Sequence, residues 1–205
     1  SSDISGLSAS TTYYYRIAAQ SSAGTSYGSE TSFITSTPAD TTAPSSSISI
    51  NSGASYTNST TVTLSLSATD SVGVTGYYLS DSSTIPSASA TGWTSVTSNT
   101  SYSATVFYSL SSGEGSKTIY AWYKDAAGNV SSTASATITL DTTVPTVTIS
   151  SPTSSSTYTT TSSTINLGGS ASDSSSGISS VAWSNNRGGN GTATGTASWT
   201  VSSIS

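Results

Sequence analysis

Apolar residues alternate with hydroxyl-bearing residues along most of the chain. In residues 61–69 the apolar side chains share one face, and Thr and Ser occupy the other; the apolar members are Val62, Leu64, Leu66 and Ala68. The same period of two recurs at 119–124 and at 137–140, and clusters of Gly, Asn, Asp and Ser separate the runs. This pattern is typical of β-strands joined by turns, with one face of each sheet packed and the other polar. It predicts an all-β protein.

A repeat divides the chain. The segments "DTTAP" at 40–44 and "DTTVP" at 141–145 lie about a hundred residues apart, which is the size of one β-sandwich domain. Each is followed by a short strand, a break, "YT", a longer strand ending in Asp, a Gly turn and a strand with aromatics. We interpret them as two copies of one module. The second copy ends at "ASWTVSSIS", before any counterpart of "YAWYKDAAGNVS".

Two family resemblances follow from these motifs. "GLSASTTYYYRIAAQSSAGTSYGSETSFIT" resembles the second half of a fibronectin type III domain, with Tyr13 at the position of its tyrosine corner. "DTTAP", "TVTLSLSATDSVGV" and "KTIYAWYKDAAGNVS" resemble the bacterial immunoglobulin-like repeats of large secreted and surface proteins. The resemblances imply tandem immunoglobulin-like and fibronectin type III β-sandwiches. Residues 1–39 would form half of one sandwich, 40–141 a complete sandwich, and 142–205 the first half of another.

Composition excludes several classes of function. Ser and Thr make up nearly half of the chain, but 12 Tyr and 4 Trp argue against disorder. The chain has no His and no Cys, which removes His-based triads, thiol nucleophiles, disulfides and the usual zinc ligands. Four basic residues and a net charge of −5 make nucleic acid an implausible partner, and no apolar run is long enough to span a membrane. With the nine acids mostly in predicted turns and no G-x-S-x-G motif, we expect no enzymatic activity.

The acids gather at the predicted joints between modules. In a sandwich of this topology, the turns holding Asp70 and Asp125–Asn129 lie at the end where the linker brings in Asp40. Carboxylates and an amide oxygen at one place point to Ca²⁺, which prefers hard oxygen ligands. Asp141 and Asp173 repeat two of these positions at the next joint. The alternative is that all these residues only shape turns, since Asp readily bonds its own backbone.

The aromatic residues leave two functions open. Five of them could form a platform for stacking sugars: Tyr14, Trp93, Tyr102, Trp183 and Trp199. Trp93, in a loop-like stretch, is the best candidate for a binding aromatic, whereas Trp122 and Trp183 are expected to fill thin cores. The family resemblance implies a structural spacer or fibre segment of a long extracellular bacterial protein. The alternative is an adhesin or carbohydrate-binding module with surface polysaccharide as its partner.

The two half-modules suggest a further possibility. About sixty front residues at the C-terminus and about thirty-seven back residues at the N-terminus sum to one module. Identical subunits could therefore complement one another head to tail in a filament. The plainer alternative is that residues 1–205 belong to a longer chain, with the neighbouring modules as the partners.

Overall fold

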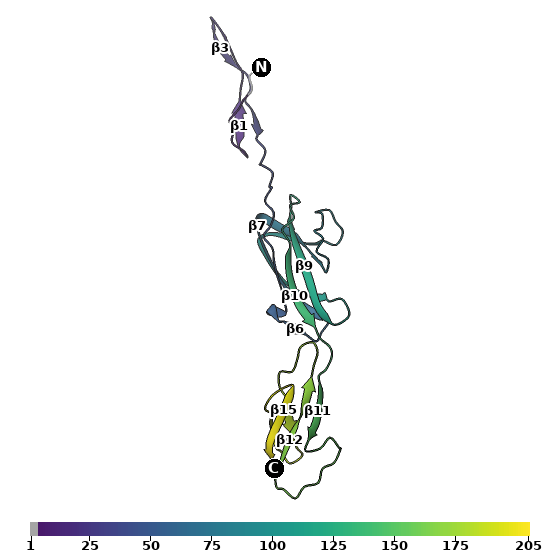
Figure 1. The fold of residues 1–205 in the computed structure, drawn as a ribbon. Helices are drawn as coiled ribbons and strands as arrows, with labels where there is room; N and C mark the ends of the chain where they lie inside the picture. Colours follow the sequence, from purple (N-terminus) through teal and green to yellow (C-terminus); the bar gives the residue numbers. More distant parts are fainter. Residues whose placement is uncertain (1–3) are drawn as a thin grey trace.

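The computed structural model describes residues 4–205 as three bodies strung along one elongated chain (Figure 1). We call them the N-terminal hairpin (residues 4–39), the central module (40–141) and the C-terminal module (142–205). Apart from one short 3-10 helix, η1 (Asn51–Gly53), the regular elements of these residues are strands. The fold is therefore all-β, as the alternation predicts. None of the described residues form a helix long and apolar enough to cross a membrane.

The strands run in this order. The N-terminal hairpin contains β1 (Thr12–Tyr15), β2 (Ala18–Ser21), β3 (Gly24–Tyr27) and β4 (Thr31–Ile34). The central module contains β5 (Ser47–Ile50), β6 (Tyr56–Thr57), β7 (Thr61–Ser80), β8 (Thr94–Ser109), β9 (Gly115–Asp125) and β10 (Ala134–Leu140). The C-terminal module contains β11 (Thr146–Ser151), β12 (Ile165–Ser172), β13 (Ala182–Ser184), β14 (Asn190–Thr192) and β15 (Ser198–Ile204).

The central module is a β-sandwich in which two long strands cross from one sheet to the other. β5 pairs with the first half of β7, which also pairs with the second half of β8. The second half of β7 pairs with β9, β9 with β10, and β10 runs parallel to the short β6. The register of β7 shifts between Thr69 and Gly76, and this irregularity marks the crossing point.

Apolar side chains from both sheets fill the space between them. The face predicted from residues 61–69 is buried, and it packs with Ile119, Ala121 and Tyr123 of β9 and with residues of β10. The Tyr123 hydroxyl donates a hydrogen bond of 2.6 Å to the Ser47 carbonyl on the facing sheet. Burying one such face supplies most of the stability available to a module of this size.

A second aromatic layer covers the outer face of β9. Trp122 is fully buried, but it lies outside the cluster between the sheets, on the opposite face of β9 from Ala121 and Tyr123. Its ring meets Tyr78 edge-on with centroids 6.1 Å apart, and Tyr78 in turn meets Trp93. Trp122 is thus buried, as expected, but it lies outside the cluster between the two sheets. The loop of residues 81–93 adjoins this layer, where Trp93 meets Tyr78 and the Ala88 carbonyl accepts from Lys124.

The C-terminal module repeats only the front of this architecture. The sheet β11–β12–β15 has the antiparallel order of β5–β7–β8, and β13–β14 corresponds to the crossing halves of β7 and β8. Its core is small, with Ala171, Trp199 and Val201 among the buried residues and Trp183 packed partly buried against them. Residues 142–205 contain no strands equivalent to β9 and β10.

The N-terminal hairpin consists of two successive pairs, β1 with β4 and β2 with β3. Its side chains are mostly exposed, and the Tyr13 ring stacks on Phe33 with centroids 5.8 Å apart. The Tyr13 hydroxyl accepts a hydrogen bond of 2.8 Å from the Ser8 amide, five residues upstream. A backward bond of this kind is the one expected of a tyrosine corner. The fibronectin type III assignment itself stays a prediction.

Candidate metal centre

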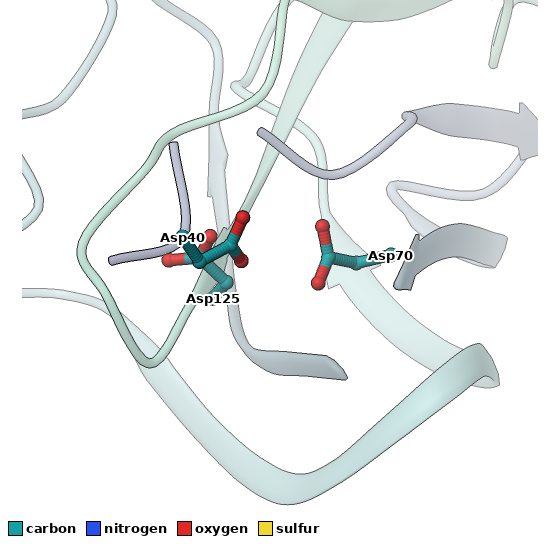
Figure 2. Close-up of side chains that lie close together, drawn as sticks. All are labelled: Asp40, Asp70 and Asp125. Carbon is teal, nitrogen blue, oxygen red and sulfur yellow. The ribbon is translucent and has the colours of Figure 1, made fainter. Parts of the chain in front are cut away.

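Three carboxylates meet at the end of the central module that receives the N-terminal linker. Asp40 lies in the linker, Asp70 precedes the crossing point of β7, and Asp125 ends β9. One oxygen of each lies within 4.8 Å of the others (Figure 2). In Figure 2 the Asp70 carboxylate faces those of Asp40 and Asp125 across a short gap. The fold thus brings together residues that are 30 to 85 positions apart in the sequence.

Each aspartate also shapes its own turn. The Oδ1 atom of Asp40 accepts from the Thr42 amide at 3.0 Å, and that of Asp70 accepts from Val72 and Gly73 at 2.9 and 2.7 Å. Gly73 has φ of 130°, a conformation that other residues rarely adopt, and an added Cβ would meet Ser98 at 2.3 Å. The turn role expected as an alternative is thus present in the structure. It uses one oxygen of Asp40 and one of Asp70.

Within residues 4–205, the second oxygens of Asp40 and Asp70 have no hydrogen-bond partner. Asp70 is 7% exposed, and its Oδ2 atom is buried without a hydrogen bond, as is Oδ2 of Asp40. Asp125 is 3% exposed. A buried oxygen of an ionised carboxylate is costly when unpaired, and like charges at this separation repel. A bound cation would remove both costs at once.

Asn129 plays a different part from the one expected. Its side-chain amide donates from Nδ2 to Oδ2 of Asp125 at 2.7 Å, and also to the carbonyls of Asp40 and Thr42. Its backbone amide donates to Oδ1 of Asp125 at 2.9 Å. In this arrangement Asn129 fastens the linker to the β9–β10 turn, and its Nδ2 rather than its oxygen faces the acids.

The nearest lysine in sequence does not neutralise this cluster. Lys124 directs its ammonium group to the other side, where it donates 2.8 Å to the Ala88 carbonyl and lies 4.8 Å from the centre of the Trp93 ring. The negative charge of the three acids is therefore left without that cation. Sequence reasoning did not anticipate this use of Lys124, because the stretch 81–93 carries no pattern that places it over β9.

The second joint brings Asp141 and Asp173 together in another way. Both accept from the Ser176 amide, Asp141 through Oδ2 at 3.0 Å and Asp173 through Oδ1 at 2.9 Å. Hydrogen bonding from the Ser175 amide, followed by those of Ser176 and Gly177, lowers the pKa of Asp173. Both oxygens of Asp141 have donors, from Thr143 and Ser176. Because amides occupy both oxygens of Asp141 and Oδ1 of Asp173, this joint offers a metal fewer free oxygens than the first joint does.

Glu114 is a residue that sequence reasoning missed. It lies in the turn before β9, at the opposite end of the central module, and both of its carboxylate oxygens accept from Thr142. The exit linker is thereby tied to the central module. The available signal was an isolated acid in the turn "SSGEGS" of a chain poor in charge.

The five aromatics considered as a sugar platform do not share a surface. Tyr14 is on the N-terminal hairpin, Tyr102 packs against the core of the central module, and Trp183 and Trp199 belong to the C-terminal module. Trp93 is half-buried, and its indole Nε1 donates to the Ser87 carbonyl at 2.9 Å. A role of Trp93 in ligand binding stays a prediction.

Comparison with known proteins gives a family match within the C-terminal module. Residues 145–204 match the bacterial Ig domain family. A crystal structure of a tetra-tandem repeat in the extending region of a large adhesion protein is 24% identical, and the match covers 96% of this chain. The chain spans about half of that structure, 49%, with a TM-score of 0.28. No curated protein matches this chain. The C-terminal module is thus the part with a bacterial Ig domain match, and its neighbour repeats the same strand order.

Proposed function

We propose that this chain is a spacer segment of a long extracellular bacterial protein, and that Ca²⁺ stiffens its first joint. The observation that carries the proposal is the convergence of Asp40, Asp70 and Asp125, with buried unpaired oxygens on Asp40 and Asp70. Asp40 belongs to the segment that enters the central module ahead of β5, whereas Asp70 and Asp125 belong to its strands β7 and β9. A cation held by all three would fix the linker to the module. The proposal assigns the chain no catalytic step.

The hydrogen bonds of the linker support a mechanical role. Besides the bonds from Asn129, the Ser45 amide donates to the Thr69 carbonyl at 2.8 Å, and the Ser46 hydroxyl donates to the Ser132 carbonyl at 2.9 Å. The linker therefore lies along the module from the acids to the start of β5. Without a cation, repulsion among the acids opposes this docking. With a cation the same acids favour it.

The donor set favours calcium over other metals. All three side chains offer oxygen, and the chain contains neither His nor Cys to supply the softer ligands of zinc or copper. Ca²⁺ takes six to eight oxygens in flexible geometry, so backbone carbonyls and water would complete the shell. Extracellular calcium modules bind with Kd of about 10⁻⁴ to 10⁻³ M, and we expect this range here.

Thermal unfolding tests the proposal. In 10 mM calcium, such a Kd stabilises the central module by about 1.4 to 2.7 kcal/mol over the EDTA form. For a module of this size, that gain raises Tm by about 6 to 13 °C. The measurement is differential scanning calorimetry of the chain in EDTA, in calcium, and in magnesium at the same ionic strength. Superimposable curves in EDTA and calcium would show that the acids are turn residues only.

A binding function is the second candidate. Trp93 is partly exposed beside Tyr78, and aromatic faces of this kind stack on sugars in carbohydrate-binding sandwiches. Affinity electrophoresis in soluble polysaccharides would separate the two functions, because a spacer should migrate as its Trp93→Ala variant does. Retardation that the substitution abolishes would favour binding. A head-to-tail filament is a more specific form of the spacer function, and it depends on the C-terminal module.

A further inference from the structure

Strand β8 forms one edge of the central module along its whole length. Its residues 101–109 pair with 61–69 of β7, and its residues 94–99 pair with 74–77 of the same strand. Among residues 4–205, β8 pairs with no strand other than β7. The opposite side of this 16-residue strand therefore presents unpaired backbone groups, to which a further strand can be added.

The hydrogen-bond register shows which backbone groups of β8 are free. The Leu110 amide donates to the Thr60 carbonyl at 2.8 Å, so these two residues form a hydrogen-bonded pair. Hydrogen-bonded and non-bonded pairs alternate along antiparallel strands. The even-numbered residues of 102–108 therefore bond to β7, and the odd-numbered residues direct their N–H and C=O groups away from it. The Ser101 amide agrees with this register, because it donates to Oδ1 of Asn99 at 2.9 Å.

The free part of this edge is the segment 103–109. Asn99 already satisfies the Ser101 amide, and the strand ends at Ser109. The residues of the segment with outward backbone groups are Ser103, Thr105, Phe107 and Ser109. The segment reads "SATVFYS", without the charged residues or Pro that commonly protect an edge strand. Its β-branched and aromatic residues favour pairing with another strand.

The sheet that ends in this edge is also free of charge. Residues 47–50, 61–69 and 101–109 contain no Asp, Glu, Lys or Arg, although the chain as a whole has a net charge of −5. Two copies that meet through this edge therefore bring no like charges together there. Phe107 is 81% exposed on the outer face of the sheet, opposite Thr63. Its ring would gain from burial against a second strand.

The segment 103–109 is complementary to itself. When two copies pair antiparallel about Val106, the odd-numbered residues of one copy lie opposite those of the other, so the outward groups of both are hydrogen-bonded. On the inner face, the half-buried Tyr108 then lies opposite Ala104 of the second copy, a large residue opposite a small one. On the outer face, Phe107 lies opposite Thr105 of the second copy, which is a favourable aromatic and β-branched pair.

We propose that the β8 edge of the central module pairs with the same edge of a second copy of this chain. The sheets β5–β7–β8 of the two copies join into one continuous sheet, with a two-fold axis at Val106. The contact is isologous, so it closes at two copies, which point in opposite directions. It involves none of the acids of the first joint. The pairing therefore goes beyond the proposed calcium function and does not depend on it.

Sedimentation equilibrium of the 205-residue chain in EDTA tests the pairing, at concentrations up to about 1 mM so that a weak Kd is detected. We expect the mass to rise from 20.4 kDa to a plateau at twice this value. Thr105→Pro should keep the monomer mass at every concentration. Proline removes the outward N–H of residue 105 and places its ring against the second strand, whereas the bonds to β7 are made by the even-numbered residues.

Two lysine substitutions separate edge pairing from contacts between sheet faces. Phe107→Lys places a charge on the edge, close to the same charge of the second copy, and should also give a monomer. Ser65→Lys is the matched control, because Ser65 lies opposite Thr105 on the same face but one strand away from the edge. This variant should still form the dimer. Near-UV circular dichroism checks the fold of each variant, and if Thr105→Pro is unfolded, Phe107→Lys decides.

Three results would overturn the proposal. The first is a monomer mass for the unchanged chain at every concentration. The second is a mass that rises beyond twice 20.4 kDa without a plateau, which would indicate open-ended association through another surface. The third is dissociation of the dimer by Ser65→Lys to the same extent as by Phe107→Lys, which would indicate that the outer faces of the sheets stack on each other.

Discussion

At the scale of single residues, Asp40 and Asp70 divide their two oxygens between two tasks. One oxygen of each accepts backbone amides and shapes a turn, and the other is buried toward the neighbouring carboxylates without a donor. A turn-shaping role and a metal-binding role of these acids are therefore compatible. Asp125 differs because both of its oxygens accept from Asn129. Of the three, Asp70 is the residue whose change best separates the two tasks.

Asp70→Asn should abolish the calcium response while keeping the turn. The amide oxygen can still accept from Val72 and Gly73, and the loss of one negative charge relieves repulsion in the absence of metal. We therefore expect an unchanged or higher Tm in EDTA and no rise in calcium, by calorimetry. Asp81→Asn, at an exposed position, is the matched control and should keep the full response. A variant that still gains stability with calcium would exclude Asp70 as a ligand.

The buried Tyr123 hydroxyl should make the protein less stable at alkaline pH. Burial, the largest cause, raises its pKa above the ordinary value of about 10. The folded state therefore holds this proton more tightly than the unfolded state does, and the contribution is complete below pH ~10 and lost as pH rises further. Urea unfolding between pH 8 and pH 11 should show the free energy of unfolding falling at the alkaline end.

Tyr123→Phe tests the assignment of that limit. It removes the bond to the Ser47 carbonyl and should lower the free energy of unfolding by about 1 kcal/mol at neutral pH. It should also make the alkaline fall shallower, because one titrating group is gone. Tyr56→Phe, at a residue that is 49% exposed, should do neither. An equally steep fall in both variants would place the alkaline limit elsewhere.

At the scale of elements, the strands could be predicted from the alternation of apolar and polar residues. The segments that pack over the outer faces of the strands could not. The face of residues 61–69 and the strands at 119–124 and 137–140 follow from a period of two, because one side of each strand packs and the other meets water. The same logic could not tell that 61–80 is one strand crossing between sheets, since the turn "DSVG" reads as a break. The burial of Trp122 against Tyr78 and Tyr120 depends on tertiary contacts alone.

The candidate metal site could be predicted from the sequence for a related reason. Acids in turns at one end of a known topology can be placed by connectivity alone, which brought Asp40, Asp70 and Asp125 to one joint. What connectivity cannot supply is side-chain direction. Asn129 turns its Nδ2 to the linker carbonyls, and Asp141 is satisfied by amides of its own joint.

The loop 81–93 should open locally without Lys124. Its ammonium group contacts the Ala88 carbonyl and the Trp93 ring. Losing both contacts should lower the free energy of local opening by about 1 to 2 kcal/mol. Lys124→Gln should then speed hydrogen exchange in 81–93 by about ten-fold, measured by mass spectrometry. Lys117→Gln, which loses a lysine bond to the Ser112 carbonyl, is the matched control. Equal protection in both variants would show that the aromatic layer alone holds the loop.

At the scale of the whole molecule, the two joints are held by different chemistry. The first depends on three acids and, we propose, a cation, whereas Glu114 ties the second through the Thr142 amide and hydroxyl. A chain of small modules contacts only its neighbours, so its stiffness is set by these joints. The first joint should therefore respond to calcium and the second should not.

Glu114→Gln should loosen the second joint. A neutral carboxamide replaces the carboxylate that accepts both bonds from Thr142, and hydrogen bonds to a neutral acceptor are weaker than bonds to a charged one. Distances between spin labels on the central and C-terminal modules should then broaden, in calcium and in EDTA alike. Glu30→Gln, on the exposed N-terminal hairpin, is the control and should leave the distribution unchanged. Equal widths for the two variants would show that Glu114 does not restrain the joint.

The most direct test of a calcium-stiffened spacer is the distance distribution across the first joint. Because the chain has no Cys, Ser26→Cys and Ser103→Cys place spin labels at two defined sites, on the N-terminal hairpin and the central module. The labelled chain, diluted in unlabelled protein, is measured by double electron–electron resonance in EDTA and in millimolar calcium. We predict a broad distribution in EDTA that narrows in calcium, and no narrowing in the Asp70→Asn variant. Identical distributions with and without calcium would contradict the account.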